Sequence, residues 1–171
     1  KKSVEALVRE FNSIRTGRAS PSLVEGVMVD YYETPTPLNQ IASISVPEAR
    51  VLLIQPWDKN ALQEVEKGIL KSDLGLVPNN DGNAIRVNIP IPTEERRREL
   101  VKLVGRAAED ALVAIRNIRR DSLEGLRQLE KDKSLSRDDA KRAQLQLQQL
   151  TDSFADRVEI VKIDKEEEVM E

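Results

Sequence analysis

Apolar residues recur at helical spacing at both ends of the chain. Near the N-terminus they predict one helix that ends at Gly17, with its apolar face formed by Val4, Leu7, Val8, Phe11 and Ile14. A second stripe follows Thr93 with a nearly seven-residue repeat and comprises Leu100, Val104, Ala107, Ala111, Ile115, Ile118, Ser122, Gly125 and Leu129. Each stripe predicts a helix that buries one face.

A break at residues 134–136 separates this second helix from a third. Ser136 followed by Asp139 resembles a capping box, which marks the start of a helix. The apolar positions of the third helix are Ala140, Ala143, Leu147, Leu150, Phe154, Val158 and Val161. Because the second and third helices have similar lengths and a short connection, we expect an antiparallel pair with the N-terminal helix beside it.

The middle of the chain follows a different pattern. All eight prolines fall between residues 21 and 92, and proline breaks helix interiors. Short apolar and β-branched runs there predict strands at 27–32, 41–46, 51–54 and 84–89. Residues 60–72 predict a helix capped by Asn60, and residues 79–82 predict a turn.

The pattern therefore predicts an α+β protein in which one domain is inserted into another. Residues 1–17 and 93–171 would form a long antiparallel three-helix bundle, and residues 18–92 a small β/α/β domain. The first helix would span about 17 residues, roughly 25 Å, beside partners about twice as long. We therefore expect about ten further residues before Lys1 in the natural chain.

Composition narrows the chemistry that this fold could carry. The 171 residues include no cysteine and no histidine, which excludes disulfides, thiol nucleophiles, imidazole bases and Cys/His zinc sites. The sequence shows no glycine-rich phosphate loop, membrane-length apolar run or signal peptide. The acidic pairs Glu94/Glu95 and Asp138/Asp139 lie at helix starts, where acids are expected for structural reasons. We expect a protein that is not an enzyme, with no metal and no cofactor.

The net charge of −3 is unevenly distributed. Residues 18–92 hold six basic and nine acidic residues, whereas the helical flanks hold 21 of each. At 100° per residue, Arg116, Arg120 and Arg127 share one face of the second helix, and Arg119 lies beside them. Arginine pairs with phosphate oxygens through its planar fork, so this face predicts a phosphate-binding surface. The same pattern is equally typical of a solvated helix face. If this face does bind nucleic acid, its lack of aromatic residues favours the backbone of a double helix over single strands.

Six blocks of the sequence form an ordered set: Arg15-Thr16-Gly17-Arg18-Ala19-Ser20-Pro21, Tyr31-Tyr32 with Thr34-Pro35 and Pro37, Ser72-Asp73-Leu74-Gly75-Leu76, Ile85-Arg86-Val87, Thr93-Glu94-Glu95-Arg96-Arg97 and residues 113–121. Together they resemble the ribosome recycling factor family. The resemblance implies an L-shaped, two-domain α+β protein, with the three-helix bundle as the long arm and the inserted domain as the short arm.

The resemblance also implies a function. Members of the family bind the large ribosomal subunit after translation termination. With elongation factor G, which hydrolyses GTP, they dissociate the post-termination complex into subunits. We accordingly expect a monomer off the ribosome in a bacterial cytoplasm, or in an organelle if a transit peptide precedes this chain. A membrane partner is not expected.

Candidate site residues follow from the same resemblance. It implies that Arg116, Arg119 and Arg120 contact ribosomal RNA, with Arg119 the strongest candidate, and the shared helix face adds Arg127. Two lysines, Lys131 and Lys133, lie at the far tip of the bundle. They are possible RNA contacts, but an ordinary solvated turn is the favoured interpretation.

The hinge between the arms falls on two connecting segments, near residues 15–21 and 90–92, and includes Arg15, Gly17, Arg18, Pro90 and Pro92. The sequence does not place the contact with elongation factor G on particular residues. A helical adaptor or chaperone that holds proteins on an apolar face is the alternative function. It predicts binding that is insensitive to salt and to the arginines, whereas RNA binding depends on both.

Overall fold

A computed structural model describes all 171 residues, which form two compact units. The helical unit comprises Lys1–Ile14 and Glu94–Glu171, and the α/β unit comprises Arg15–Thr93. The first boundary therefore follows residue 14 rather than residue 17, because the Arg15 side chain already donates a hydrogen bond to the Leu74 carbonyl in the α/β unit.

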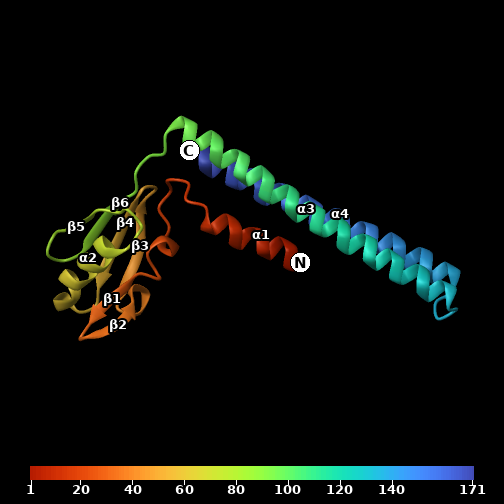
Figure 1. The fold of residues 1–171 in the computed structure, drawn as a ribbon, viewed down its shortest axis with the longest axis horizontal. Coiled ribbons are helices and arrows are strands. Elements are labelled where there is room, and N and C mark those ends of the chain that lie inside the picture. Colours follow the sequence, from red (N-terminus) through yellow and green to blue (C-terminus); the bar gives the residue numbers. More distant parts are fainter. The chain divides into compact units, whose positions relative to one another are not determined.

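The helical unit is the antiparallel three-helix bundle that the sequence predicts. It consists of α1 (Lys2–Ser13), α3 (Glu94–Lys131) and α4 (Arg137–Met170). α3 and α4 run side by side (Figure 1), and Arg97 near the start of α3 donates to the Met170 carbonyl at the end of α4 at 3.3 Å. Phe11 of α1, Val104 of α3 and Val158 of α4 meet in one buried core. None of the helices has the length and apolar character needed to cross a membrane.

α1 is shorter than the sequence pattern predicts. It ends at Ser13 and Ile14 is extended, so the prediction that Gly17 stops this helix is wrong. With 12 residues, α1 covers about 18 Å of α3, whose 38 residues extend for about 57 Å.

The length of α1 decides how much of the predicted apolar seam is buried. Along α3 the buried positions end at Ile115, and beyond it Ile118 and Leu129 are 57% and 46% exposed. On α4, Leu150 is likewise 56% exposed. The repeat predicts all three as buried. In the 171 residues described they are exposed, because α1 begins beside Ile118 and Leu150, which share a hollow with Lys1 and Ser3, and does not extend over them.

The connection between the long helices follows the expected capping chemistry. The Ser136 side chain accepts a hydrogen bond from the Asp139 amide at 3.1 Å, which confirms the predicted start of α4. Ahead of it, Lys133 adopts a left-handed conformation with φ of +61°, and the next amide, that of Ser134, bonds back to the Leu129 carbonyl. Lys133 therefore has a backbone role in ending α3.

The α/β unit contains a four-stranded antiparallel sheet in the order β3-β4-β6-β5 and a separate hairpin. The four predicted strands are confirmed as β1 (Met28–Tyr31), β3 (Ala42–Glu48), β4 (Val51–Pro56) and β6 (Ile85–Asn88). Two strands that the sequence does not predict are β2 (Thr34–Pro37) and β5 (Pro78–Asn80). Both contain proline and each pairs on one side only, a position where a missing N–H is tolerated.

Helix α2 (Leu62–Lys71) packs against this unit through Val65 and Ile69, which are fully buried with Leu52, Ile54, Ile85 and Val87. The prediction that Asn60 caps α2 is wrong. A 3₁₀ turn precedes the helix, and Asp58 caps that turn by accepting a hydrogen bond from the Asn60 amide at 2.9 Å.

The core of the α/β unit gives a first stability test. Leu52 is fully buried on β4, whereas Leu70 on α2 is 58% exposed. We expect Leu52→Ala to lower the free energy of unfolding by about 2–5 kcal/mol and Leu70→Ala by less than about 0.5 kcal/mol. Urea unfolding followed by Trp57 fluorescence reports on this unit, because Trp57 is the only tryptophan. Equal effects of the two substitutions would contradict the assignment of the core.

Candidate nucleic-acid interface

Packing of one face of α3 leaves the four candidate arginines on its open surface. Ala108 and Ile115 are buried against the rest of the helical unit. At 100° per residue, Arg116, Arg120 and Arg127 lie roughly 100–140° around the helix from Ile115, whereas Arg119 lies about 40° from it, at the edge of the packed face. All four arginines are exposed, and we call them the arginine surface: Arg116, Arg119, Arg120 and Arg127. Arg116 to Arg120 span little more than one turn, and Arg127 follows about 10 Å further along the helix.

The four arginines differ in their partners. Arg116 forms an ion pair with Glu109, Arg120 lies 3.7 Å from Asp121, and Arg127 lies 3.8 Å from Glu124. Arg119 has no hydrogen bond or ion pair in the structure. Because exposed ion pairs contribute little free energy, a phosphate group can replace these carboxylates, and at Arg119 it displaces nothing.

Arg119 also lies beside apolar surface. It lines a hollow of about 140 Å³ formed by α3, α4 and the start of the chain; the other lining residues are Lys1, Ser3, Ile115, Ile118, Leu147, Leu150, Thr151 and Phe154. A guanidinium next to apolar groups is less screened by water, which strengthens its interaction with an incoming anion. These two features set Arg119 apart from the other three arginines.

The two candidate lysines lie apart from the arginine surface. Lys131 is the last residue of α3, and Lys133 is in the turn before α4. Both side chains are exposed. About 6 Å of helix separates Arg127 from Lys131, and the acidic residues Glu130 and Asp132 flank Lys131 in the sequence.

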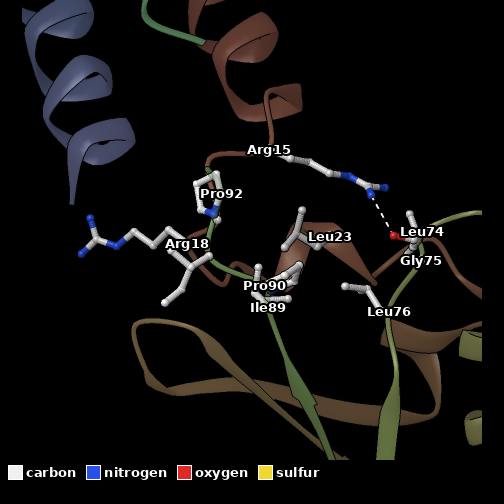
Figure 2. Close-up of a pocket in the computed structure, with 11 residues that line it drawn as sticks. Arg15, Arg18, Leu23, Leu74, Gly75, Leu76, Ile89, Pro90 and Pro92 are labelled. Carbon is white, nitrogen blue, oxygen red and sulfur yellow. Dashed lines mark hydrogen bonds between the residues drawn. The ribbon is translucent and has the colours of Figure 1, made fainter. Parts of the chain in front are cut away.

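The predicted hinge residues come together around one cavity of about 200 Å³ (Figure 2). Arg15, Gly17 and Arg18 line it from the first connecting segment, and Pro90 and Pro92 from the second. The Arg15 guanidinium spans part of the cavity and donates to the Leu74 carbonyl at 3.0 Å. All of these residues belong to the α/β unit.

Both connecting segments are fastened to that unit by backbone hydrogen bonds. The Ala19 amide donates to the Ala49 carbonyl at 2.7 Å, and the Ile89 amide donates to the Arg50 carbonyl at 2.8 Å. Gly17 has a φ of +86°, and a Cβ atom there would lie 2.4 Å from Pro92 Cδ. Glycine is therefore required at position 17 because the two segments touch, whereas sequence reasoning assigned it to helix termination and bending.

Sequence reasoning missed one further cluster in the α/β unit. The hydroxyls of Tyr32 and Tyr31 donate to the same Asp58 oxygen at 2.8 and 3.4 Å. Tyr31-Tyr32 and Trp57-Asp58 are conspicuous in a chain with only 3% aromatic residues. The scarcity of aromatic residues is the one sequence signal for this cluster. The hydrogen bond itself has no sequence signal, because Tyr32 and Asp58 are 26 positions apart.

Comparison with known proteins identifies the family to which this fold belongs. A model of the family described as "Ribosome recycling factor" matches residues 7–170. The chain belongs to the ribosome recycling factor family. A ribosome-recycling factor from Oleidesulfovibrio alaskensis is 56% identical over 170 residues, covering 99% of this chain and 92% of the relative. One from a Geobacillus species is 55% identical with the same coverage.

Solved structures agree with this assignment. The solution structure of a ribosome recycling factor is similar with a TM-score of 0.74 and 44% identity, covering 99% of this chain and 90% of that chain. A second match, with a TM-score of 0.64 and 46% identity, covers 99% and 92%. That structure comprises models for the Thermus thermophilus ribosome recycling factor and the Escherichia coli elongation factor G bound to the E. coli post-termination complex. The two-unit α+β architecture is thus that of the family.

The contact between the connecting segments can be tested with a pair of glycines. We expect Gly17→Ala to destabilise the α/β unit by about 2 kcal/mol or more, because it adds a left-handed backbone penalty to a clash with Pro92. Gly105→Ala, on an open stretch of α3 with nothing within 4 Å, should instead stabilise the helical unit by about 0.5–1 kcal/mol. Urea unfolding followed by Trp57 fluorescence and by helical circular dichroism separates the two effects. A neutral Gly17→Ala would contradict the contact.

Proposed function

We propose that this chain recycles ribosomes. It binds the large ribosomal subunit after termination and, with elongation factor G and GTP, dissociates the post-termination complex into subunits. Family membership over nearly the whole chain carries this proposal. The partners are those named for the Thermus thermophilus relative.

The chain itself acts as a binding protein rather than an enzyme. It has no histidine or cysteine and no phosphate-binding glycine loop, so GTP hydrolysis belongs to the elongation factor. Because the relatives are bacterial, the compartment we propose for this activity is the bacterial cytoplasm. The chain supplies two things to the process: a charged helix surface and a second unit joined to it by two segments.

The arginine surface is the proposed contact with large-subunit ribosomal RNA. Four arginines on one helix face present bidentate donors to backbone phosphates. No tyrosine, tryptophan or phenylalanine lies among them on α3, so the surface suits structured RNA rather than stacked single-strand bases. Arg119 contributes most because it has no internal partner to give up. Lys131 and Lys133 extend the same electrostatic surface without being essential to it.

If the arginine surface binds RNA, the affinity for large subunits should depend on Arg119 and on the salt concentration. Arg119→Ala should weaken binding to purified large subunits and reduce the slope of log affinity against log salt by about one unit. Arg142→Ala, which removes an exposed arginine of α4, should leave both affinity and slope unchanged. Filter binding at several salt concentrations measures both quantities. If Arg119→Ala behaves like Arg142→Ala, the assignment of the contact fails.

The hinge is proposed at the outer ends of the two connecting segments. Residues 15–19 and 89–92 are held to the α/β unit through Ala19, Ile89 and the contact of Gly17 with Pro92. Bending therefore concentrates at Ile14–Arg15 and at Thr93–Glu94, where the two units join. The bundle domain accordingly comprises residues 1–14 and 94–171. The elongation factor would then move the α/β unit together with its own connecting segments.

Amide hydrogen exchange tests where the chain bends. We expect the amides of Ala19 and Ile89 to exchange as slowly as those of the central sheet, because each is hydrogen-bonded to the α/β unit. The Arg15 amide should exchange much faster. Rapid exchange at Ala19 would show that the first connecting segment is loose and that bending extends through residues 15–21.

A further inference from the structure

The chain contains a single Asp-Gly step, at Asp81-Gly82. It lies in the connection between β5, which ends at Asn80, and β6, which begins at Ile85. Asp-Gly steps are chemically labile in flexible peptides, because the amide nitrogen of the glycine attacks the aspartate side chain. Glycine favours this attack, since it has no side chain in the way and leaves the backbone free to rotate. The β5–β6 connection is therefore a candidate modification site.

The reaction exchanges one acyl bond for another. It starts from the protonated carboxyl group: the Gly82 nitrogen bonds to Asp81 Cγ and loses its proton, and one carboxyl oxygen leaves as water, which closes a succinimide ring. Water then opens the ring. Attack at Cγ restores aspartate, whereas attack at the main-chain carbonyl carbon of Asp81 gives isoaspartate, in which the chain runs through the side chain. The net change is an isomerisation, so water is the only co-reactant.

The folded turn restrains the nucleophile. The Gly82 amide donates a hydrogen bond to Asn80 Oδ1 at 2.8 Å, and an acceptor oxygen beside this N–H opposes the loss of its proton. Gly82 has a φ of +87°, a conformation that glycine adopts without strain. Asn80 is itself held, because its Nδ2 donates to Glu66 Oε2 of α2 at 3.2 Å. The Gly82 amide must give up its bond to Asn80 before ring closure.

The electrophile is restrained as well. Asp81 Oδ1 accepts hydrogen bonds from the amides of Ala84 and Asn83 at 2.8 and 2.9 Å. The Ala84 amide, followed by the Asn83 amide, holds the pKa of Asp81 below its ordinary value. The carboxyl group therefore stays ionised at neutral pH, whereas ring closure needs it protonated. The Asp81 amide also donates to the Ala84 carbonyl at 3.2 Å, which closes the turn.

These restraints last only while β5 is paired. β5 has three residues and pairs with β6 on one side only. A short edge strand opens at a lower free-energy cost than the centre of a sheet. Because Asn80 belongs to β5, opening of this strand separates it from the Gly82 amide and releases the Asp81 carboxylate from the turn. Opening thus makes both reacting groups available together.

We propose that Asp81 is a latent site of isoaspartate formation, closed in the folded chain by the β5–β6 turn and exposed when this hairpin opens. Isoaspartate adds a methylene to the main chain and moves the carboxylate away from the amides of Asn83 and Ala84. The turn then cannot re-form, so an opening event in which the reaction occurs becomes permanent. The modification therefore marks chains in which the hairpin has opened, and it does not depend on ribosome binding.

Peptide mapping by liquid chromatography and mass spectrometry separates isoaspartate from aspartate at position 81. The full chain is incubated at neutral pH, in buffer and in urea that unfolds it. Asp81 should isomerise about tenfold or more faster in urea than in buffer, because the unfolded chain has lost the turn. Trp57 fluorescence shows whether the α/β unit is folded in each sample.

Asn80→Ala tests the bond to the Gly82 amide. In folded chains in buffer, it should raise the rate of isomerisation at Asp81 about three- to tenfold, the range that corresponds to one lost hydrogen bond. Asn79→Ala is the matched control, because it removes the neighbouring exposed asparagine and leaves the acceptor of the Gly82 amide in place. This control should change the rate by less than about twofold.

Three results would overturn the proposal. Equal rates in buffer and in urea would show that the turn gives no protection, and no isoaspartate at position 81 in urea would show that this step is not labile. Equal rates in folded Asn80→Ala and Asn79→Ala would show that the bond to Asn80 does not restrain the Gly82 nitrogen. If Asn80→Ala unfolds the unit, the comparison of buffer with urea in the unsubstituted chain still decides the proposal.

Discussion

Burial of one face of α3 determines where this protein carries its charge. Val104, Ala108 and Ile115 pack against α1 and α4, and the helical rotation then directs Arg116, Arg120 and Arg127 to the open side. Since a helix of 38 residues is one rigid element, the same packing aligns the arginines in a row. The acidic neighbours of three of them reduce the local potential, and this is why we propose Arg119 as the main phosphate contact.

The second constraint is the way the connecting segments are held. Gly17 allows the first segment to touch Pro92 of the second, and Arg15 reaches across to the Leu74 carbonyl. Proline and glycine might have indicated a loose joint, but here they produce close packing. In the proposed function, this close packing would confine bending to short stretches at the edge of the α/β unit, so that a force applied to the unit would be transmitted to the joint.

Much of this architecture could be read from the sequence because it depends on local regularities. The period of apolar residues locates α3 and α4, Ser136 marks the start of α4, and apolar β-branched runs mark β1, β3, β4 and β6. The sequence does not reveal β2 and β5, whose prolines argue against strands and are tolerated only because each strand pairs on one side. Nor does it show that Ile118 and Leu129 are exposed, since that depends on how far α1 extends beside them.

The candidate RNA-binding site could also be predicted only in part from the sequence. Helical periodicity places the arginines on one face, but the pairing of Arg116 with Glu109 and the isolation of Arg119 depend on side-chain conformation. The bond between Tyr32 and Asp58 joins distant parts of the sequence and has no local signature.

Light scattering from purified post-termination ribosomes tests the central claim most directly. Addition of this chain with elongation factor G and GTP should lower the scattered intensity as the subunits separate, and omission of any one component should prevent the decrease. Constant intensity with all three present would contradict the account.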